Sequence, residues 1–255
     1  MYINNVNIFY YLLFGVLGLI VGEFSLWCNY AMVEEKKIFS KEILKINSIK
    51  KDYKYIILVL NVLVYIGLLY RFGFKQTFFA NLDLIKFMIL TPMLISAFFI
   101  DLKHRIIPNR LNMTIFEVGI VFLFLYGINN ANIGKDMLLG MFVGGGIFLL
   151  ITLLGGLIAG KEAMGLGDVK LMGALGLFFG AASIAEISLL SFFIGAIISI
   201  FIIIIRKFIL KVEDEYMPFG PFLTLSALIC IFIPANTVFY LFLSMCQSIR
   251  YMLIK

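Results

Sequence analysis

Long apolar runs separated by short polar stretches follow one another along the whole chain. A helix needs about 20 apolar residues to cross a hydrocarbon core of ~30 Å, and most of the runs approach that length. Lipid accepts only segments whose backbone hydrogen bonds close within the protein, and runs this long are not barrel strands. The pattern therefore predicts an all-α, polytopic integral membrane bundle of about eight transmembrane helices. The predicted spans are residues 8–27, 55–70, 87–100, 113–128, 137–159, 169–179, 184–205 and 219–245.

Composition and charge refine this picture. Hydrophobic residues make up 62% of the 255 residues against 14% charged, which excludes a secreted disulfide scaffold, a nucleic-acid module and a disordered tail. The net charge of +6 is explained by the membrane topology, because short cytoplasmic segments accumulate Lys and Arg. With the N-terminus outside, fifteen of the 21 Lys and Arg lie on the inner side, which predicts an N-out, C-out orientation. The inner segments are residues 31–54, 101–112, 160–170 and 206–218.

Cysteine and histidine are too sparse for two common kinds of site. Cys28, Cys230 and Cys246 stand singly in or beside different apolar runs, and His104 is the only histidine. An ordinary zinc site cannot be assembled from these residues, so no metal is expected. A serine or cysteine nucleophile activated by histidine is also disfavoured, because His104 stands alone in a basic loop and no G-x-S-x-G motif occurs.

Acidic residues in or beside the apolar runs are costly in a membrane, so each is a candidate site. Asp101 directly ends an apolar run, and the following Pro108 and Asn109 break any helix there. Asp168 follows Gly165 and Gly167, and glycine allows another chain to approach closely or the backbone to adopt unusual angles. Both aspartates fall on the predicted inner side. The full set of candidates is Glu23, Asp83, Asp101, Glu117, Asp168 and Glu186.

Two carboxylates at one membrane face suggest aspartic protease chemistry. Like charges a few Å apart cannot both ionise cheaply, so such a pair shares one proton. The charged member can then draw a proton from water while the protonated member polarises a peptide carbonyl. Two other readings stay open from these residues: a structural turn at Asp168, and a proton-coupled membrane transporter that uses paired carboxylates.

Three motifs carry a family resemblance, and they occur in the order DLKHRIIPN at 101–109, GLGDVKL at 165–171 and MPFGPFL at 217–223. Together they resemble the bacterial type IV prepilin peptidases, which are G-x-G-D intramembrane aspartic proteases. The resemblance implies that Asp101 and Asp168 are the catalytic aspartates and that the peptidase needs no cofactor. It further implies a multi-pass protein of the bacterial inner membrane, with its active site at the cytoplasmic face.

The same resemblance names the substrate and the residues that shape the site. The substrates would be type IV prepilin or pseudopilin precursors within the lipid bilayer, cut just after a glycine that precedes their hydrophobic helix; no nucleic-acid partner is expected. Pro218 to Pro221 would either leave backbone groups unpaired to hold an extended substrate, or form a rigid turn entering a helix. The expected site-shaping residues are Pro108, Asn109, Gly165, Gly167, Lys170, Pro218, Phe219, Gly220 and Pro221.

The N-terminal region departs from the family pattern. We expect residues 1–86 to form N-terminal helices with a shortened, degenerate methyltransferase-type loop, and residues 87–255 to form the peptidase membrane domain. Many family members also methylate the new pilin N-terminus from S-adenosylmethionine, often with two C-x-x-C pairs in a cytoplasmic segment that here has no cysteine. Residues 22–29 resemble only a degraded form of the family's G-S-F-x-N pattern. If methylation is retained, Glu23 is the candidate residue and S-adenosylmethionine the cofactor.

Two further interpretations are less favoured. The presenilin and signal peptide peptidase branch shares G-x-G-D, but it has a Tyr-Asp pair where this chain has Ile100 before Asp101, and the chain contains no Pro-Ala-Leu. An inactive assembly factor is also less favoured, because it would have no need to keep both aspartates. The sequence therefore favours the prepilin peptidase hypothesis, with a proton-coupled transporter as its alternative from another class.

Overall fold

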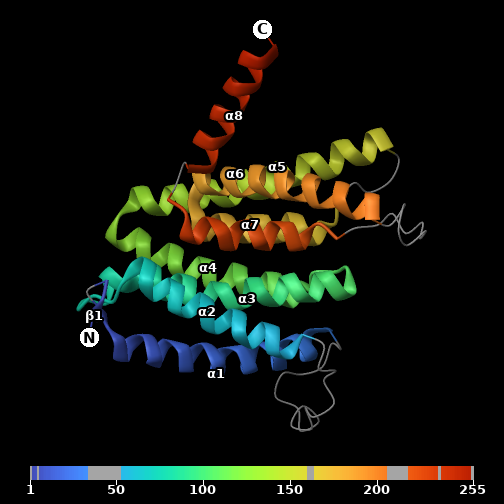
Figure 1. The fold of residues 1–255 in the computed structure, drawn as a ribbon. Coiled ribbons are helices and arrows are strands. Elements are labelled where there is room, and N and C mark those ends of the chain that lie inside the picture. Colours follow the sequence, from blue (N-terminus) through green and yellow to red (C-terminus); the bar gives the residue numbers. More distant parts are fainter. Residues whose placement is uncertain are drawn as a thin grey trace. The chain divides into compact units, whose positions relative to one another are not determined.

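The protein is helical almost throughout (Figure 1). The structure, a computed structural model, describes residues 2–4, 6–33, 53–159, 164–205, 218–234 and 237–253. It divides into two compact units, Met1–Glu117 and Val118–Lys255, and α4 runs from the first into the second. The α-helices are α1 (Ile8–Val33), α2 (Lys54–Phe72), α3 (Leu82–His104), α4 (Asn109–Asn129), α5 (Ala131–Ala159), α6 (Leu166–Ile205), α7 (Gly220–Phe232) and α8 (Thr237–Leu253).

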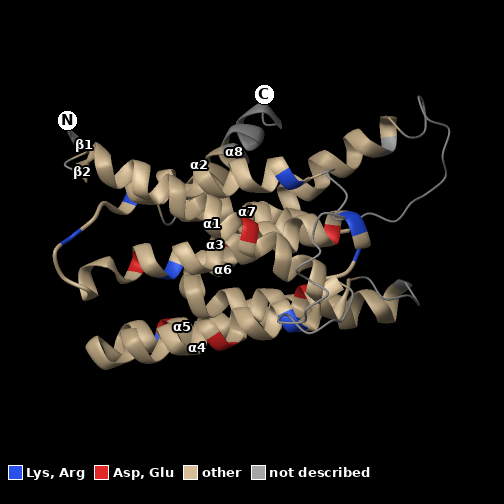
Figure 2. Ribbon diagram, turned by 90° about the horizontal axis from the view of Figure 1, so that it is seen from below, with Lys and Arg blue, Asp and Glu red and all other residues tan. Residues whose placement is uncertain are grey.

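Most of the described helices are long and apolar enough to cross a membrane. Six of them meet that test, or seven segments if α7 and α8 count as one bent span. Lys, Arg, Asp and Glu are few along these helices, which carry other residues over most of their length (Figure 2). The predicted all-α polytopic membrane bundle is confirmed, whereas the number of crossings and the N-out, C-out orientation stay predictions.

In the first unit, α1 and α2 pack closely against each other. A Cβ on Gly18 of α1 would lie 2.9 Å from the Cα of Val62 on α2, so only glycine allows this approach. A two-stranded antiparallel hairpin, β1 (Tyr2–Ile3) and β2 (Val6–Asn7), precedes α1. Asn4 in its turn donates from Nδ2 to the Tyr70 carbonyl at 2.8 Å, which fixes the hairpin to the end of α2.

The third helix begins earlier than the predicted span 87–100. After a short 3-10 turn, η2 (Phe79–Asn81), α3 starts at Leu82 and includes two charged residues in its first two turns. Lys86 pairs with Asp83 at 3.1 Å, and its Nζ also lies 4.6 Å from the ring centre of Phe87. Because the two charges compensate each other at i and i+3, they do not end the helix. α3 is therefore long enough to be a full span.

In the second unit, α6 folds back on itself at Gly180. The backbone of Gly180 has φ 78° and ψ 175°, which is not helical, inside a stretch otherwise assigned to one helix. A Cβ on Gly144 of α5 would lie 2.5 Å from the carbonyl oxygen of Met172 and 2.9 Å from Cγ1 of Ile184. In a continuous helix these two residues would be about 18 Å apart, so they can only meet one glycine if the chain reverses between them.

The reversal gives α6 two arms, the first arm being residues 166–179 and the second arm residues 181–205. The first arm runs antiparallel to α5, with Gly176 beside Gly140 and Gly173 beside Gly145. The second arm runs parallel to α5, since Phe192 stacks on Phe148 at 5.6 Å between ring centres. Both arms can be followed in Figure 1 by the change from gold to orange. The arms coincide with the separate predicted spans 169–179 and 184–205.

Asp136, near the start of α5, stabilises the reversal. Its Oδ1 accepts a hydrogen bond from the backbone N–H of Ala181 at 3.2 Å, so the carboxylate caps the second arm of α6. Its Oδ2 fills the position that a Cβ on Gly180 would occupy. Glycine is thus required at 180 both for its positive φ and for this contact.

Replacing Asp136 with alanine is expected to lower the free energy of unfolding by about 1 kcal/mol, because the first N–H of the second arm loses its acceptor. Asp136→Asn keeps an acceptor oxygen and is expected to retain most of the stability. Thermal unfolding of the two purified variants in detergent, followed by circular dichroism, compares them. Equal midpoints for the alanine variant and the original chain would contradict the capping role.

The last predicted span, 219–245, is not one straight helix. α7 ends at Phe232 and α8 begins at Thr237, and the two helices point in different directions (Figure 1). Pro234 causes the break, because it cannot donate an N–H and it disfavours helical angles at the residue before it. Ile233 accordingly has extended angles, φ −93° and ψ 142°. The predicted span is therefore bent at this point, and whether α7 and α8 make one crossing stays a prediction.

Candidate active site

Asp101 lies in the last turn of α3, where the helix ends. Its carbonyl accepts a hydrogen bond from the Arg105 N–H at 2.8 Å, and Arg105 closes the helix with a left-handed φ of 58°. The next helix starts at Asn109, with the carbonyl of Pro108 accepting from the Leu111 and Asn112 N–H groups. The predicted break at Pro108 and Asn109 is confirmed. The Asp101 residue is only 4% exposed, so its carboxyl group is held away from bulk solvent although it stands at a helix end.

Asp168 lies in the first turn of α6 and is 8% exposed. Its backbone N–H donates to the Gly165 carbonyl at 3.0 Å, which makes a tight turn before the helix. Neither Gly165 nor Gly167 has a positive φ, so the expectation of unusual backbone angles there was wrong. A Cβ on Gly165 would lie 3.7 Å from Asp168 Oδ2. The glycine therefore leaves one side of the carboxylate uncovered, in agreement with the other expectation, close approach.

The reversal of α6 sets the depth of Asp168 within the second unit. Asp168 is one turn before Met172, and Met172 is level with Gly144, so Asp168 is level with Phe148 on α5. α5 continues from Phe148 to Ala159, roughly 16 Å further. The first arm of α6 is only about 21 Å long, well short of a hydrocarbon core of ~30 Å. Asp168 is therefore recessed below the end of α5.

The segment 218–221 lies at the same level as Asp168. The ring of Phe219 is 6.3 Å from that of Phe148 and 5.3 Å from that of Phe192 on the second arm of α6. Thr224 Oγ1 donates to the carbonyls of Gly220 and Pro221, and the Phe219 carbonyl accepts from two N–H groups of α7. These carbonyl groups are paired, and Pro221 stands in the first turn of α7. Of the two readings for 218–221, the geometry agrees with a rigid turn that enters a helix.

Three of the other residues considered lie at the surface. Lys170 is exposed in the second turn of α6, Glu117 is exposed on α4, and the loop residue His104 is exposed at the end of α3. Glu23 forms a salt bridge with Lys54 at 3.0 Å, and its side chain is 52% exposed. This ion pair links α1 to the first residue of α2, which is a structural explanation for Glu23. Its role in methylation stays a prediction.

The pairing of the two aspartates stays a prediction as well. Asp101 belongs to the first compact unit and Asp168 to the second. Within its own unit, each aspartate is buried at a helix end. A site that accepts a polypeptide at the membrane boundary needs its carboxyl groups at such a position. The division after Glu117 reflects packing, and it does not test the expected boundary between residues 86 and 87.

Asp136 and Glu186 are two acidic residues for which the sequence indicated no structural role. Asp136 did not figure among the candidates, although an acid in the first turns of a helix facing a glycine-rich reversal is a recognisable capping signal. Glu186, on the second arm of α6, is 6% exposed, and its Oε1 meets no hydrogen-bond partner among the described residues. We find no chemical partner that explains it.

The middle of the chain is similar to a known protein family. Residues 88–200, which include both aspartates, match the type IV leader peptidase family. The chain is 31% identical over 144 residues to the prepilin leader peptidase/N-methyltransferase of Aeromonas hydrophila, covering 56% of this chain and 48% of that protein. It is 34% identical over 142 residues to the protein of the same name from Legionella pneumophila, covering 54% and 46%.

A longer match extends the same relationship. The prepilin leader peptidase/N-methyltransferase of Xanthomonas campestris pv. campestris is 28% identical over 175 residues, covering 68% of this chain and 56% of that protein. The chain spans about half the length of the curated relatives it matches. No solved structure matches the chain. The resemblance that the three sequence motifs indicated is confirmed.

Proposed function

We propose that this multi-pass membrane protein is an aspartic endopeptidase acting on type IV pilin-like precursors, because its residues 88–200 match the type IV leader peptidase family. One observation carries the proposal: the matched segment contains both Asp101 and Asp168, each buried at the end of an apolar helix. Nothing in the comparisons supports the alternative of a proton-coupled transporter.

In the proposed reaction the two carboxyl groups act as one unit that holds a single proton. The ionised carboxylate takes a proton from water, and the water oxygen adds to the carbonyl carbon of the scissile peptide bond. The protonated carboxyl group meanwhile donates to the carbonyl oxygen. The carbon–nitrogen bond then breaks, and the leaving amine receives a proton. Which aspartate is base and which is acid depends on the pair as a whole, so neither role is assigned to one residue.

The recess of Asp168 supports a cut at the boundary of an apolar helix. A precursor with a basic leader and an apolar stem would keep the leader in the aqueous phase and the stem in lipid. Its scissile bond would then reach the depth of Asp168 and of the turn at 218–221. We propose that this occurs at the cytoplasmic face of the bacterial inner membrane, just after a glycine, and that prepilins and pseudopilins are the substrates.

Methylation of the new N-terminus is a separate question. The relatives are named prepilin leader peptidase/N-methyltransferase, which makes S-adenosylmethionine a plausible cofactor. Among the described residues, the candidate Glu23 is exposed, and its carboxylate pairs with Lys54. The segment 34–52, where the family carries its cytoplasmic domain, lies outside the described residues. We therefore derive no step through S-adenosylmethionine.

Co-expression with a pilin-like precursor tests the proposal. The precursor should lose its basic leader only when this chain is present, and mass spectrometry should place the new N-terminus directly after the glycine. A precursor that keeps its leader in the presence of correctly inserted protein would refute the peptidase. The same spectrum reports methylation, because an N-terminus without an added methyl group would remove that activity from the proposal.

A further inference from the structure

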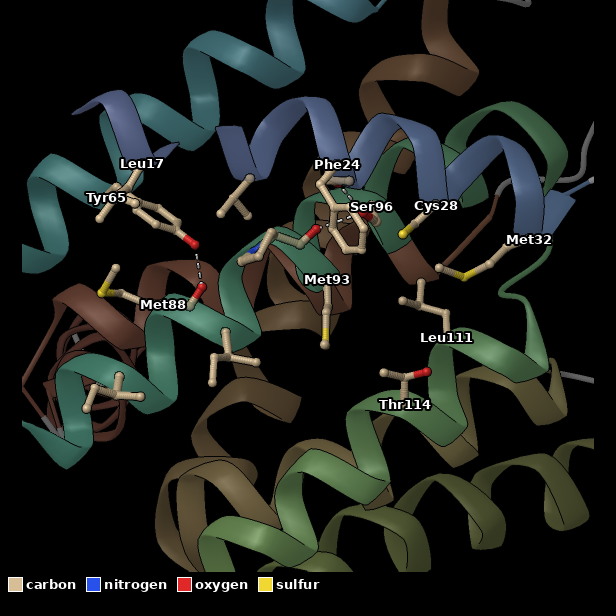
Figure 3. A pocket seen from close by; sticks show the side chains of 15 residues that line it. Leu17, Phe24, Cys28, Met32, Tyr65, Met88, Met93, Ser96, Leu111 and Thr114 are labelled. Carbon is tan, nitrogen blue, oxygen red and sulfur yellow. Dashed lines mark hydrogen bonds between the residues drawn. The ribbon is translucent and has the colours of Figure 1, made fainter. Parts of the chain in front are cut away.

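A narrow apolar groove runs through the first unit, and Figure 3 shows the side chains that line it. It has a volume of about 530 Å³, and residues of α1, α2, α3 and the start of α4 line it. On α1 the lining extends from Leu17 to Met32, a distance of roughly 22 Å along the helix. On α3 it includes Met93 and Ser96, whereas Asp101 is about 140° away from Ser96 around the helix at 3.6 residues per turn.

The polar atoms in the groove are already satisfied within the protein. Pro92 has no N–H, so the carbonyl of Met88 is released from the helix, and the Tyr65 hydroxyl donates to it at 2.8 Å (Figure 3). Ser96 donates to the Pro92 carbonyl, which leaves Ser25 to donate to Ser96 Oγ at 2.7 Å. Thr114 donates to the carbonyl of Arg110 at 2.9 Å. The protons of these four hydroxyl groups are all donated within the protein, so an apolar occupant fits the groove best.

The dimensions select the kind of apolar occupant. The groove holds about 530 Å³ along roughly 22 Å of α1. A helix of that length, about 10–12 Å wide with its side chains, would fill roughly 1,700 Å³ or more. The groove therefore cannot enclose a helix, whereas a slender apolar chain fits within it.

Charge at one end of the groove indicates what that apolar chain is attached to. Lys103 follows Ser96 by seven residues on α3, which is two turns, so it continues the groove-lining face beyond the apolar section. It is exposed and forms no ion pair with a described residue. Arg110 is exposed next to the groove-lining Leu111. This positive end complements an anionic headgroup at the membrane surface.

We propose that the groove binds one acyl chain of an anionic phospholipid, whose phosphate lies beside Lys103. The lipid fills the space between α1 and α3, two helices that contact each other directly through the pair of serines. It thereby completes the packing of the first unit in the membrane. The binding is independent of peptidase activity, so the two proposals stand or fall separately.

The test uses the full chain reconstituted in nanodiscs with phosphatidylglycerol that carries a photoreactive group in one acyl chain. After illumination, mass spectrometry should find most of the label on groove residues such as Met32 and Met93. Cys28→Phe, which fills the groove, should lower this labelling at least about fivefold. Ile20→Phe is the matched control, because Ile20 is on α1, 60% exposed and outside the groove, and it should leave the labelling unchanged.

A second filling variant, Thr114→Phe on α4, keeps the test valid if Cys28→Phe does not fold. Lys103→Gln should reduce the preference for phosphatidylglycerol over a phosphatidylcholine probe that carries the same group. Labelling that both filling variants leave unchanged would overturn the proposal. Equal labelling by the two lipids would also overturn it. A third contrary result would be a precursor whose apolar stem displaces the lipid and, through a photoreactive residue, labels the groove itself.

Discussion

Asp168→Asn is expected to slow leader removal by about 10³-fold or more, because an amide can neither take a proton from water nor share one with a second carboxyl group. Asp101→Asn should have an effect of the same size. Both substitutions keep the volume of the side chain, so the helices should stay folded. The initial rate of leader loss, measured with purified protein and a pilin-like precursor in proteoliposomes, checks the prediction.

The control for this prediction is an exposed acid outside the proposed site. Glu117→Gln removes a carboxylate that is exposed on α4, and it should leave the rate unchanged. If either catalytic variant still trims the leader as fast as the original chain, the two-aspartate mechanism is wrong.

Whether the two aspartates form a pair is tested by combining the variants. Groups that act as one unit lose almost all activity when either is removed, so Asp101→Asn with Asp168→Asn should be no slower than each single variant. Independent groups would instead give multiplied losses. A short bifunctional thiol reagent should also join Asp101→Cys to Asp168→Cys in a chain without other cysteines, and should not join Asp83→Cys to Asp168→Cys.

Local patterns in the sequence were sufficient to predict most helices. Apolar length located the spans, and Pro108 marked the end of α3 as expected. α3 begins at Leu82, five residues before the predicted span, and Asp83 and Lys86 in this added part neutralise each other. The spacing i, i+3 carries that information, but hydropathy averaged over a window does not. The break before α8 was also predictable from the sequence, because Pro234 disfavours helical angles at Ile233.

The depth of the candidate site could not be predicted from such patterns. The motif identified Asp168, but its recess depends on Gly144 meeting two residues of α6 that are twelve positions apart. Contacts of that kind are set by packing between α5 and α6 and leave no periodic trace in either helix. Gly140 and Gly144 form a small-xxx-small pair, which is typical of close helix packing, but such a pair does not indicate which helix approaches or that α6 reverses.

The close approach of α5 and α6 leads to the second large expected effect. Gly176→Ala should lower the free energy of unfolding by about 3 kcal/mol, because the added Cβ would overlap the backbone of Gly140, which has no side chain that could move aside. The two helices would have to separate, and the first arm of α6 carries Asp168. Unfolding by a denaturing detergent, followed by circular dichroism, measures the stability, and the leader-removal assay should show a parallel loss of activity.

Gly146→Ala provides the matched comparison, since it adds the same methyl group to α5 at a position where a Cβ would meet nothing within 4 Å. It should be neutral or stabilise the protein by roughly 0.5 kcal/mol, because alanine favours a helix more than glycine does. Opposite signs for these two substitutions would separate close helix contact from helix propensity. Equal and small effects would mean that α5 and the first arm of α6 are not in contact at Gly140 and Gly176, and the depth inferred for Asp168 would then be wrong.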